Sequence, residues 1–282
     1  MADPRVFQIA ALGGLTAYGM SALDLELSVD RFLLVVGAAL ATEGLGRWLR
    51  GERFDPRSPL ITAFSLSLLL RAASPWLATL AAVLAIGSKH LLRARGSHVF
   101  NPANFGIVVL LLVTDQAWVS AGQWGHAAIL TLALAGVGQL VIHRAARSDV
   151  TWAFLAAWVA LSFGRASWLG DPWAIPLHQL ENGALLIFAF FMISDPRTTP
   201  RSRAGRLVYA AGVATAGFVL RFGFYEPNGL LFALFAAAPF VPLLDRWLPG
   251  PVFRWAPVLE EKFHASHPAS APGFLPLARG VR

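Results

Sequence analysis

The sequence predicts an all-α, polytopic membrane protein with about ten transmembrane helices, and three observations support this fold class. Of the 282 residues, 56% are hydrophobic and only 14% are charged, whereas soluble domains average about 25% charged residues. Long apolar segments recur along the chain. The basic residues gather on one side of the membrane that those segments would cross.

Ten apolar segments approach the roughly 20 residues that a helix needs to cross a bilayer. They cover residues 5–23, 29–46, 59–71, 74–91, 101–114, 124–143, 149–164, 176–193, 206–222 and 227–245. The third, fifth and seventh segments are short, so we expect short or broken helices, with room for a five-plus-five inverted repeat. Pro239 and Pro242 predict a kink in the tenth segment.

The basic residues orient these segments. If the N-terminus is cytoplasmic, all but four of the 23 Lys and Arg residues fall in cytoplasmic loops or at the cytoplasmic termini. The exceptions are Arg31, Arg71, Arg165 and Arg221. This is the asymmetry of the positive-inside rule. We expect a multi-pass protein of the bacterial cytoplasmic membrane with both termini inside. The lipid bilayer accounts for the +7 net charge better than a nucleic acid does.

The tryptophans and the tail complete this organisation. All but one of the ten tryptophans fall at segment ends or in loops, where indoles anchor helices at the headgroup level. The exception is Trp158, inside the seventh segment. Residues 249–282 are rich in Pro, Ser, His and Gly. We therefore expect a transmembrane domain over residues 1–248 and a cytoplasmic tail over residues 249–282.

The first motif combines Gly87-Ser88-Lys89 with Phe100-Asn101-Pro102-Ala103-Asn104. Asn101 and Pro102 form a helix-start signal. The apolar run that follows is about 18 Å long at 1.5 Å per residue, which is short for a hydrocarbon core of about 30 Å. One interpretation is a helix that begins inside the membrane after an irregular stretch containing Gly96, and that offers N–H groups to an anion or polar ring. The other is a capped helix after an ordinary cytoplasmic loop.

The second motif is the stretch from Phe191 to Pro200, with Asp195, Thr198 and Thr199 at the cytoplasmic end of the eighth segment. Its hydroxyl groups can donate hydrogen bonds to an oxygen-rich ligand, or they can cap a turn. A rigid turn with basic anchors is the competing interpretation.

Several kinds of chemistry are not expected. The chain has no cysteine, which removes thiolate, zinc-thiolate and iron–sulfur chemistry. His264 and His267 lack further metal-ligating neighbours, so we expect no metal site. Glu43 lies four residues before Arg47 and predicts a helical ion pair. Nucleotide-binding and hydrolase motifs are missing from the sequence, and we expect no catalytic residue.

Together the two motifs resemble the NqrB/RnfD family. Gly87-Ser88-Lys89 with Phe100-Asn101-Pro102-Ala103 resembles its G-K…F-N-P-A signature, and residues 191–245 resemble its carboxy-terminal block. The similarity covers about residues 55–247. It implies a membrane subunit of bacterial, flavin-dependent complexes that couple electron transport to Na⁺ or H⁺ movement, with other membrane subunits as partners. It also implies that the residues near a flavin are Lys89, Asn101, Pro102, Asn104, Asp195, Thr198 and Thr199.

One departure from the family pattern concerns the cofactor. Full family members attach FMN to a threonine in an S-G-A-T-like motif, whereas Ser120-Ala121-Gly122 here has another order and no threonine follows it. We therefore expect FMN or riboflavin to be bound without a covalent bond. At most the chain would be a redox or ion-translocating subunit, not a catalyst on its own. The alternatives are a stand-alone transporter or channel for a small polar solute, and a membrane component of a biosynthetic cluster.

Overall fold

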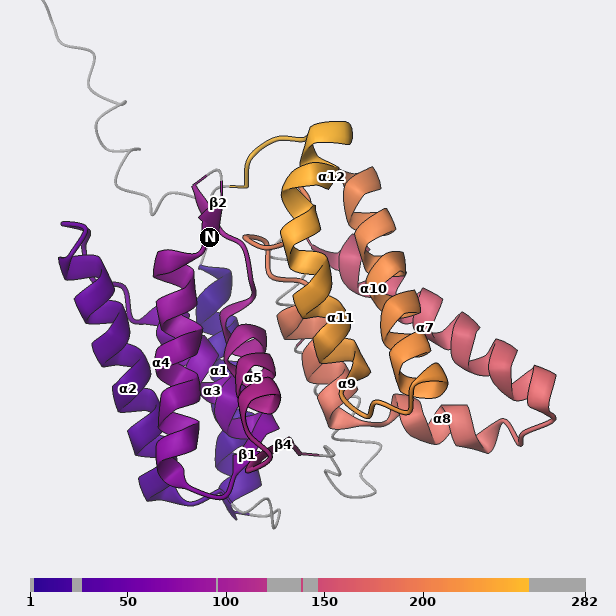
Figure 1. The fold of residues 1–282 in the computed structure, drawn as a ribbon, viewed down its shortest axis with the longest axis horizontal. Coiled ribbons are helices and arrows are strands. Elements are labelled where there is room, and N and C mark those ends of the chain that lie inside the picture. The colour runs from indigo at the N-terminus through magenta and orange to yellow at the C-terminus, as the bar shows by residue number, and fades with distance from the viewer. Residues whose placement is uncertain (1–2, 22–26, 95, 121–137, 139–146, 254–282) are drawn as a thin grey trace, which may run out of the picture. The chain divides into compact units, whose positions relative to one another are not determined.

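The computed structural model describes residues 3–21, 27–94, 96–120, 138 and 147–253. The chain divides into a compact unit, Pro4–Phe253, and a second unit made of residues 1–3 and 254–282, of which only Asp3 is described. The unit Pro4–Phe253 is built almost wholly of helices, as the sequence predicts (Figure 1).

The first five predicted segments are all helices. They are α1 (Pro4–Ser21), α2 (Val29–Trp48), α3 (Arg57–Leu69), α4 (Pro75–Leu91) and α5 (Pro102–Val113). Two short antiparallel strand pairs join their ends. β1 (Leu70–Ala72) pairs with β4 (Ala117–Val119), and β2 (Arg93–Ala94) pairs with β3 (Ser97–His98). These strands sit in connections, so they do not change the helical fold class.

The described part of the second half is also helical. It contains α7 (Ser148–Leu169), α8 (Ala174–Leu180), α9 (Gly183–Ile187), the π-helix η1 (Phe188–Met192), α10 (Arg203–Gly223), α11 (Gly229–Ala237), the 3-10 turn η2 (Ala238–Phe240) and α12 (Val241–Trp247). The predicted sixth segment, 124–143, lies outside the described residues apart from residue 138. The turn η2 falls where Pro239 predicts a kink.

Two of the described helices are long and apolar enough to cross a membrane, Ser148–Leu169 and Gly229–Trp247. The bent pair Ala174–Leu180 and Gly183–Met192, with an angle of 54°, would be a third. Of the other helices, some are short, such as the 13-residue α3, α2 carries several charges, and α1 is long enough but not apolar enough. The fold is thus an all-α membrane protein, and the count of ten spans and the inverted repeat stay predictions.

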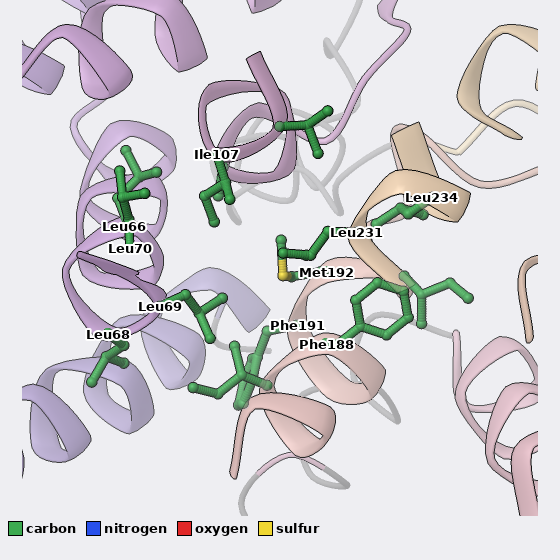
Figure 2. Packing of buried hydrophobic residues seen from close by; sticks show 14 of the residues in the cluster. Leu66, Leu68, Leu69, Leu70, Ile107, Phe188, Phe191, Met192, Leu231 and Leu234 are labelled. Carbon is green, nitrogen blue, oxygen red and sulfur yellow. The ribbon is translucent and has the colours of Figure 1, made fainter. Parts of the chain in front are cut away.

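The buried core joins both halves of the chain. α4 packs against α5 and α2, α10 packs against α7 and α11, and α5 contacts α11. Figure 2 shows where these groups meet, with Ile107 of α5 near Met192 of η1 and Leu231 of α11. The close contact of α5 with α4 needs a glycine, because a Cβ on Gly106 would lie 2.5 Å from the carbonyl oxygen of Ala81.

The tryptophans behave as the sequence predicts. The described ones at helix ends and in loops are exposed, from 47% at Trp118 to 89% at Trp168, while Trp158 is 1% exposed. Trp124 and Trp255 lie outside the described residues. Exposed indoles at helix ends fit membrane anchors, and the buried one needs a separate explanation.

Several contacts join loops that the charge pattern assigns to one side of the membrane. Arg5 binds Asp55 at 2.8 Å, and Arg206 binds Asp149 at 2.6 Å, all in predicted cytoplasmic regions. The β1–β4 pair joins the predicted outer ends of α3 and α5. In each of these contacts, the two helix ends that meet are ends that the charge pattern assigns to the same side of the membrane.

Candidate functional site

Asn101 begins α5 as the sequence predicts. Its side-chain oxygen accepts a hydrogen bond from the Asn104 N–H at 3.1 Å, and Pro102 occupies the first helical position. The preceding β2–β3 hairpin turns at Gly96, whose φ is +84°, a conformation that favours glycine. The capped, 12-residue helix is therefore confirmed, and the stretch before it is a short β-hairpin instead of irregular backbone. Whether the helix begins inside the membrane stays a prediction.

Asp195 organises the second motif into a turn. The Arg197 N–H donates to its carboxylate at 3.0 Å. The Thr198 and Thr199 hydroxyls donate to its backbone oxygen at 3.4 and 3.1 Å. The hydroxyl groups are thus used within the turn, which is the rigid-turn interpretation, although both threonines also line a cavity.

The two motifs meet in space, as the family resemblance implies by placing residues of both near a flavin. The Asn101 side-chain amide donates to the Met192 carbonyl oxygen at 3.3 Å. The His98 ring lies 3.5 Å from the Asp195 carboxylate. We call this contact between residues 97–104 and 191–199 the junction. It encloses a small cavity of about 50 Å³, lined among others by His98, Thr198 and Thr199.

Charges hold the junction together. Burial would raise the pKa of Asp195, but His98 and the Arg197 N–H outweigh it and lower the pKa. Arg147, which the sequence pattern did not single out, donates to the Thr199 hydroxyl at 3.0 Å. Burial, together with the nearby charge of Arg206, lowers the pKa of Arg147 to about 10, so it stays protonated at neutral pH.

Asn104 carries the one atom of the predicted site that lacks a partner in the part of the chain that the structure describes. Its side-chain amide donates to the Leu231 carbonyl oxygen at 3.2 Å. Its side-chain oxygen is buried and accepts no hydrogen bond there. Buried polar atoms are usually paired, so this oxygen is an open acceptor at the junction.

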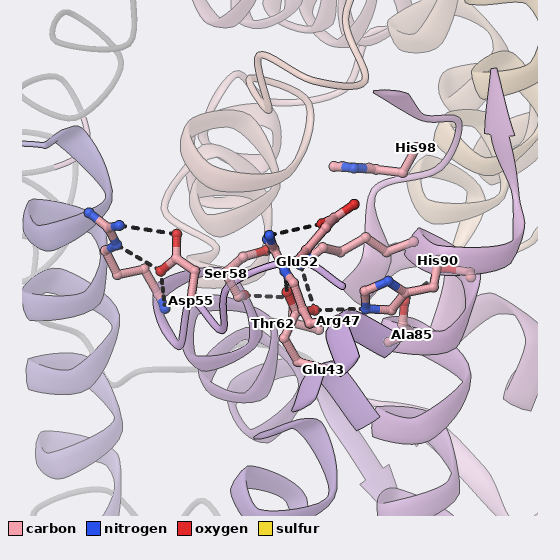
Figure 3. A network of polar contacts seen from close by, with 12 residues as sticks. Glu43, Arg47, Glu52, Asp55, Ser58, Thr62, Ala85, His90 and His98 are labelled. Carbon is pink, nitrogen blue, oxygen red and sulfur yellow. Dashed lines mark hydrogen bonds and ion pairs between the residues drawn. The ribbon is translucent and has the colours of Figure 1, made fainter. Parts of the chain in front are cut away.

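Lys89 makes its contacts in another group. Its ammonium binds the Glu43 carboxylate at 2.7 Å and the Ser58 hydroxyl at 3.0 Å. Glu43 is completely buried and also binds Arg47 at 2.8 Å and His90 at 3.0 Å. We call these residues the Glu43 cluster (Figure 3). The Glu43–Arg47 pair was predicted, whereas Lys89 and His90 come from α4 and were not placed with Glu43.

Close helix contact makes this cluster possible. Arg50 also contacts His90. A Cβ on Gly46 would lie 2.5 Å from the His90 ring, so a glycine is needed for the ring to lie against α2. With three basic partners, the Glu43 carboxylate is fully used within the protein.

A larger cavity of about 240 Å³ lies elsewhere in the unit. α9 with η1, and α11 with the loop before it, supply most of its lining, and Trp158 of α7 adds a ring. The polar lining residues are Ser120, Gln179, Asn182, Arg221 and Asn228. We call it the Trp158 cavity. Among the described residues there is no group of three or more side chains able to hold a metal ion.

Known proteins share this sequence pattern. The sequence model of the "NQR2, RnfD, RnfE family" matches residues 114–254. Among curated relatives, the RnfD subunit of the ion-translocating oxidoreductase complex of Alcanivorax borkumensis is 29% identical, over 77% of this chain and 82% of the relative. The protein of the same name from Stutzerimonas stutzeri is 29% identical over 83% and 85%. That from Pseudomonas paraeruginosa is 27% identical over 67% and 72%. Because the family match covers half of the chain, and includes the turn around Asp195, the chain belongs to the NQR2, RnfD, RnfE family.

Proposed function

We propose that the chain is a membrane subunit of an ion-translocating, flavin-linked electron-transport complex and works with other membrane subunits. The carrying observation is that the two motifs that resemble the family meet at the junction. The names of the relatives support the same role, since each is a subunit of an ion-translocating oxidoreductase complex.

The orientation proposed is the one that the basic residues predict. The chain would lie in the bacterial cytoplasmic membrane, with both termini inside and a tail from residue 249. Ion pairs between predicted cytoplasmic regions, such as Arg5 with Asp55 and Arg201 with Asp245, support the placement of these regions on one side of the membrane. The assignment of that side to the cytoplasm depends on the basic residues.

The cofactor proposed is non-covalent FMN or riboflavin at the junction. When bound, a flavin would supply the capacity to accept and donate electrons. The open oxygen of Asn104, which does not line the small cavity, would accept from a ring N–H if the cavity extended to it. The Thr198 and Thr199 hydroxyls would donate to the ring carbonyls only after leaving the Asp195 backbone oxygen to which they now donate. Asn101 and Pro102 would fix the start of α5, and Asp195 would hold the turn through His98.

Size sets a condition on this proposal. The junction cavity is about 50 Å³, whereas sites for ligands of drug size are about 300–1,000 Å³. The polar edge of a flavin ring could pair with the Asn104 side-chain oxygen. The whole ring would fit only if the turn at residues 195–199 moved outward and enlarged the cavity. Lys89 would act from the Glu43 cluster, by fixing α4 ahead of the hairpin that leads to His98.

Flavin retention tests the proposal. The full chain is purified in mild detergent with its neighbouring subunits, incubated with riboflavin or FMN, gel-filtered, and read by visible absorbance before and after denaturation. We expect retained flavin that denaturation releases, and about tenfold weaker retention in Asn104→Leu. Gln116→Leu, which changes an exposed amide, is the matched control. Absence of flavin from the wild type in every preparation would overturn the cofactor, and flavin left on the denatured chain would overturn its non-covalent character.

A second candidate is a stand-alone transporter for a small polar solute. The bend of 54° between Ala174–Leu180 and Gly183–Met192 favours it, because broken helices line the substrate sites of many transporters. Solute uptake by liposomes that contain the chain alone would support this candidate. Co-purification with redox subunits and no uptake would count against it. Co-purification with soluble biosynthetic enzymes instead would indicate a membrane component of a biosynthetic cluster.

A further inference from the structure

The predicted cytoplasmic ends of α2 and α4 expose large apolar side chains beside arginines. Trp48 and Leu49, at the end of α2, are 75% and 69% exposed, and Leu91, the last residue of α4, is 82% exposed. Arg50 follows α2 directly, and Arg93 lies two residues after α4. We call these five residues the Arg50 surface. Apolar side chains and arginines at the cytoplasmic end of a membrane helix are placed to meet lipid tails and headgroups.

Contacts between the two helices bring their ends together. α2 packs along α4 (Figure 1). Arg50 contacts the ring of His90, the residue directly before Leu91. A Cβ on Gly46 would lie 2.5 Å from the same ring, so the backbone of α2 lies against the end of α4. The apolar side chains of both helix ends therefore belong to one surface around Arg50.

The Glu43 cluster holds the Arg50 guanidinium in place. Arg50 Nη2 contacts His90 Nδ1, and His90 Nε2 lies 3.0 Å from the Glu43 carboxylate. Arg50 Nε has no hydrogen-bond partner among the described residues, and it lies 3.6 Å from the Glu52 carboxylate, which Arg47 already binds at 3.0 Å. The Arg50 side chain is still 27% exposed. A guanidinium has five N–H donors in a planar fork that matches a phosphate. Arg50 is thus a positioned donor with capacity left for an external oxyanion.

Positive charge gathers at this surface. Arg50, Arg53 and Arg93 lie close to the two helix ends. Arg93 donates to the Gly96 carbonyl oxygen at 2.8 Å, and neither Arg53 nor Arg93 has an ion-pair partner in the described ranges. An anionic headgroup would supply the complementary charge. A soluble anion would leave the three apolar side chains of the surface in water, so the combination favours a lipid.

We propose that the Arg50 surface is a binding site for an anionic phospholipid of the cytoplasmic leaflet. Arg50 donates to the phosphodiester oxygens, and Arg93 adds positive charge. Trp48, Leu49 and Leu91 lie against the acyl chains. The site does not depend on flavin binding at the junction.

The test uses the full chain in mild detergent and two lipids with the same acyl chains, dioleoyl phosphatidylglycerol and dioleoyl phosphatidylcholine. Native mass spectrometry measures the affinity for each. We expect the anionic lipid to bind about tenfold more tightly. Arg50→Gln should abolish that preference, and Arg50→Lys, which keeps the charge without the fork, should retain part of it. Leu91→Glu should weaken binding of the anionic lipid several-fold more than Leu91→Gln, at a position too exposed for either change to affect folding.

The matched control is Arg246→Gln. Arg246 is also exposed at a predicted cytoplasmic helix end and precedes a tryptophan, Trp247, that is 67% exposed. It should leave the preference unchanged, because no buried cluster positions that arginine among the described residues. An unchanged preference in Arg50→Gln, or equal weakening by Leu91→Glu and Leu91→Gln, would overturn the proposal. Equal affinity of the wild type for the two lipids would also overturn it and would leave the surface to an acidic protein partner.

Discussion

The Glu43 cluster and the Trp158 cavity both place polar groups in an apolar interior. They differ in whether those groups have hydrogen-bond or ion-pair partners within the protein. In the cluster, the Glu43 carboxylate has three basic partners within 3.0 Å. In the cavity, Arg221 and the Trp158 N–H have no acceptor among the described residues. A completed network holds helices together, while an uncompleted one leaves binding capacity for another molecule. At these two sites, the pairing of the buried polar groups therefore separates a network that joins helices from a cavity that could bind another molecule.

The largest loss of stability should come from removing the carboxylate at the centre of the Glu43 cluster. Glu43→Gln leaves the ammonium of Lys89 buried without its carboxylate, and removing one partner of a buried pair costs about 3–5 kcal/mol. Thermal unfolding in detergent, followed by tryptophan fluorescence, should show a large fall in midpoint. Glu52→Gln, at an exposed carboxylate, is the control and should change stability by less than about 0.5 kcal/mol. Equal midpoints for the two variants would contradict the role assigned to the cluster.

The junction is intermediate, because only Asn104 is incomplete there. Asn101→Ala should cost about 1 kcal/mol through the lost helix cap, together with the hydrogen bond to Met192. Asn101→Ser keeps a capping oxygen and loses the amide donor to Met192. We expect the serine variant to unfold between the wild type and the alanine variant. If both variants unfold alike, the cap contributes nothing and the Met192 contact carries the whole effect.

Asp55 is a carboxylate with basic partners, like Glu43, but it is less buried, and the pH dependence of stability tests its contribution. Burial would raise the pKa of Asp55, but hydrogen bonds from Arg57 and the charge of Arg5 lower it to about 2. The unfolded value is about 3.9, so this stabilisation is complete above about pH 4 and is lost as the pH falls toward 2. Because the arginines remain partly hydrated, we expect about 1 kcal/mol. Asp55→Asn should remove this part of the acid dependence, and an unchanged acid profile would argue against the pair.

The smallest effect on stability should come from a substitution of Arg221 in the Trp158 cavity. Arg221→Met removes a charge that has no ion-pair partner in the described ranges, so stability should change by less than about 0.5 kcal/mol or rise slightly. The same thermal assay checks it. A loss as large as that of Glu43→Gln would mean that Arg221 is a structural residue, and the contrast between the two sites would disappear.

The sequence predicts features whose cause is local. The Asn101–Pro102 helix start and the Glu43–Arg47 pair depend on residues three or four positions apart, and both are confirmed. The apolar segments likewise predict nine helical regions that the structure describes. These patterns do not predict which residue of a neighbouring helix contacts a given side chain.

Long-range contacts account for most of what was missed. His90 reaches Glu43, and Arg147 reaches Thr199, across 47 and 52 residues of chain, and no spacing rule predicts such pairs. The break in the eighth segment had a signal that was not used. Asn182 and Gly183 form a helix start in its middle, and the Asn182 side chain accepts from the Ala184 N–H at 2.8 Å. Trp158 was noted as the one tryptophan inside a segment, but its burial was not inferred from that position, where an interfacial anchor is not expected.

The shortness of α5 has an electrical consequence in the proposed orientation. Its 12 residues span about 18 Å, against about 30 Å for a full hydrocarbon core. Where such a short helix separates the two aqueous faces, a given membrane potential acts over about 0.6 of the usual distance, and the local field is about 1.7 times stronger. Less displacement is then needed for an electron or a cation beside α5 to sense the whole potential. In the proposed orientation, the short α5 thus makes the electric field strongest near the junction, where the two motifs meet.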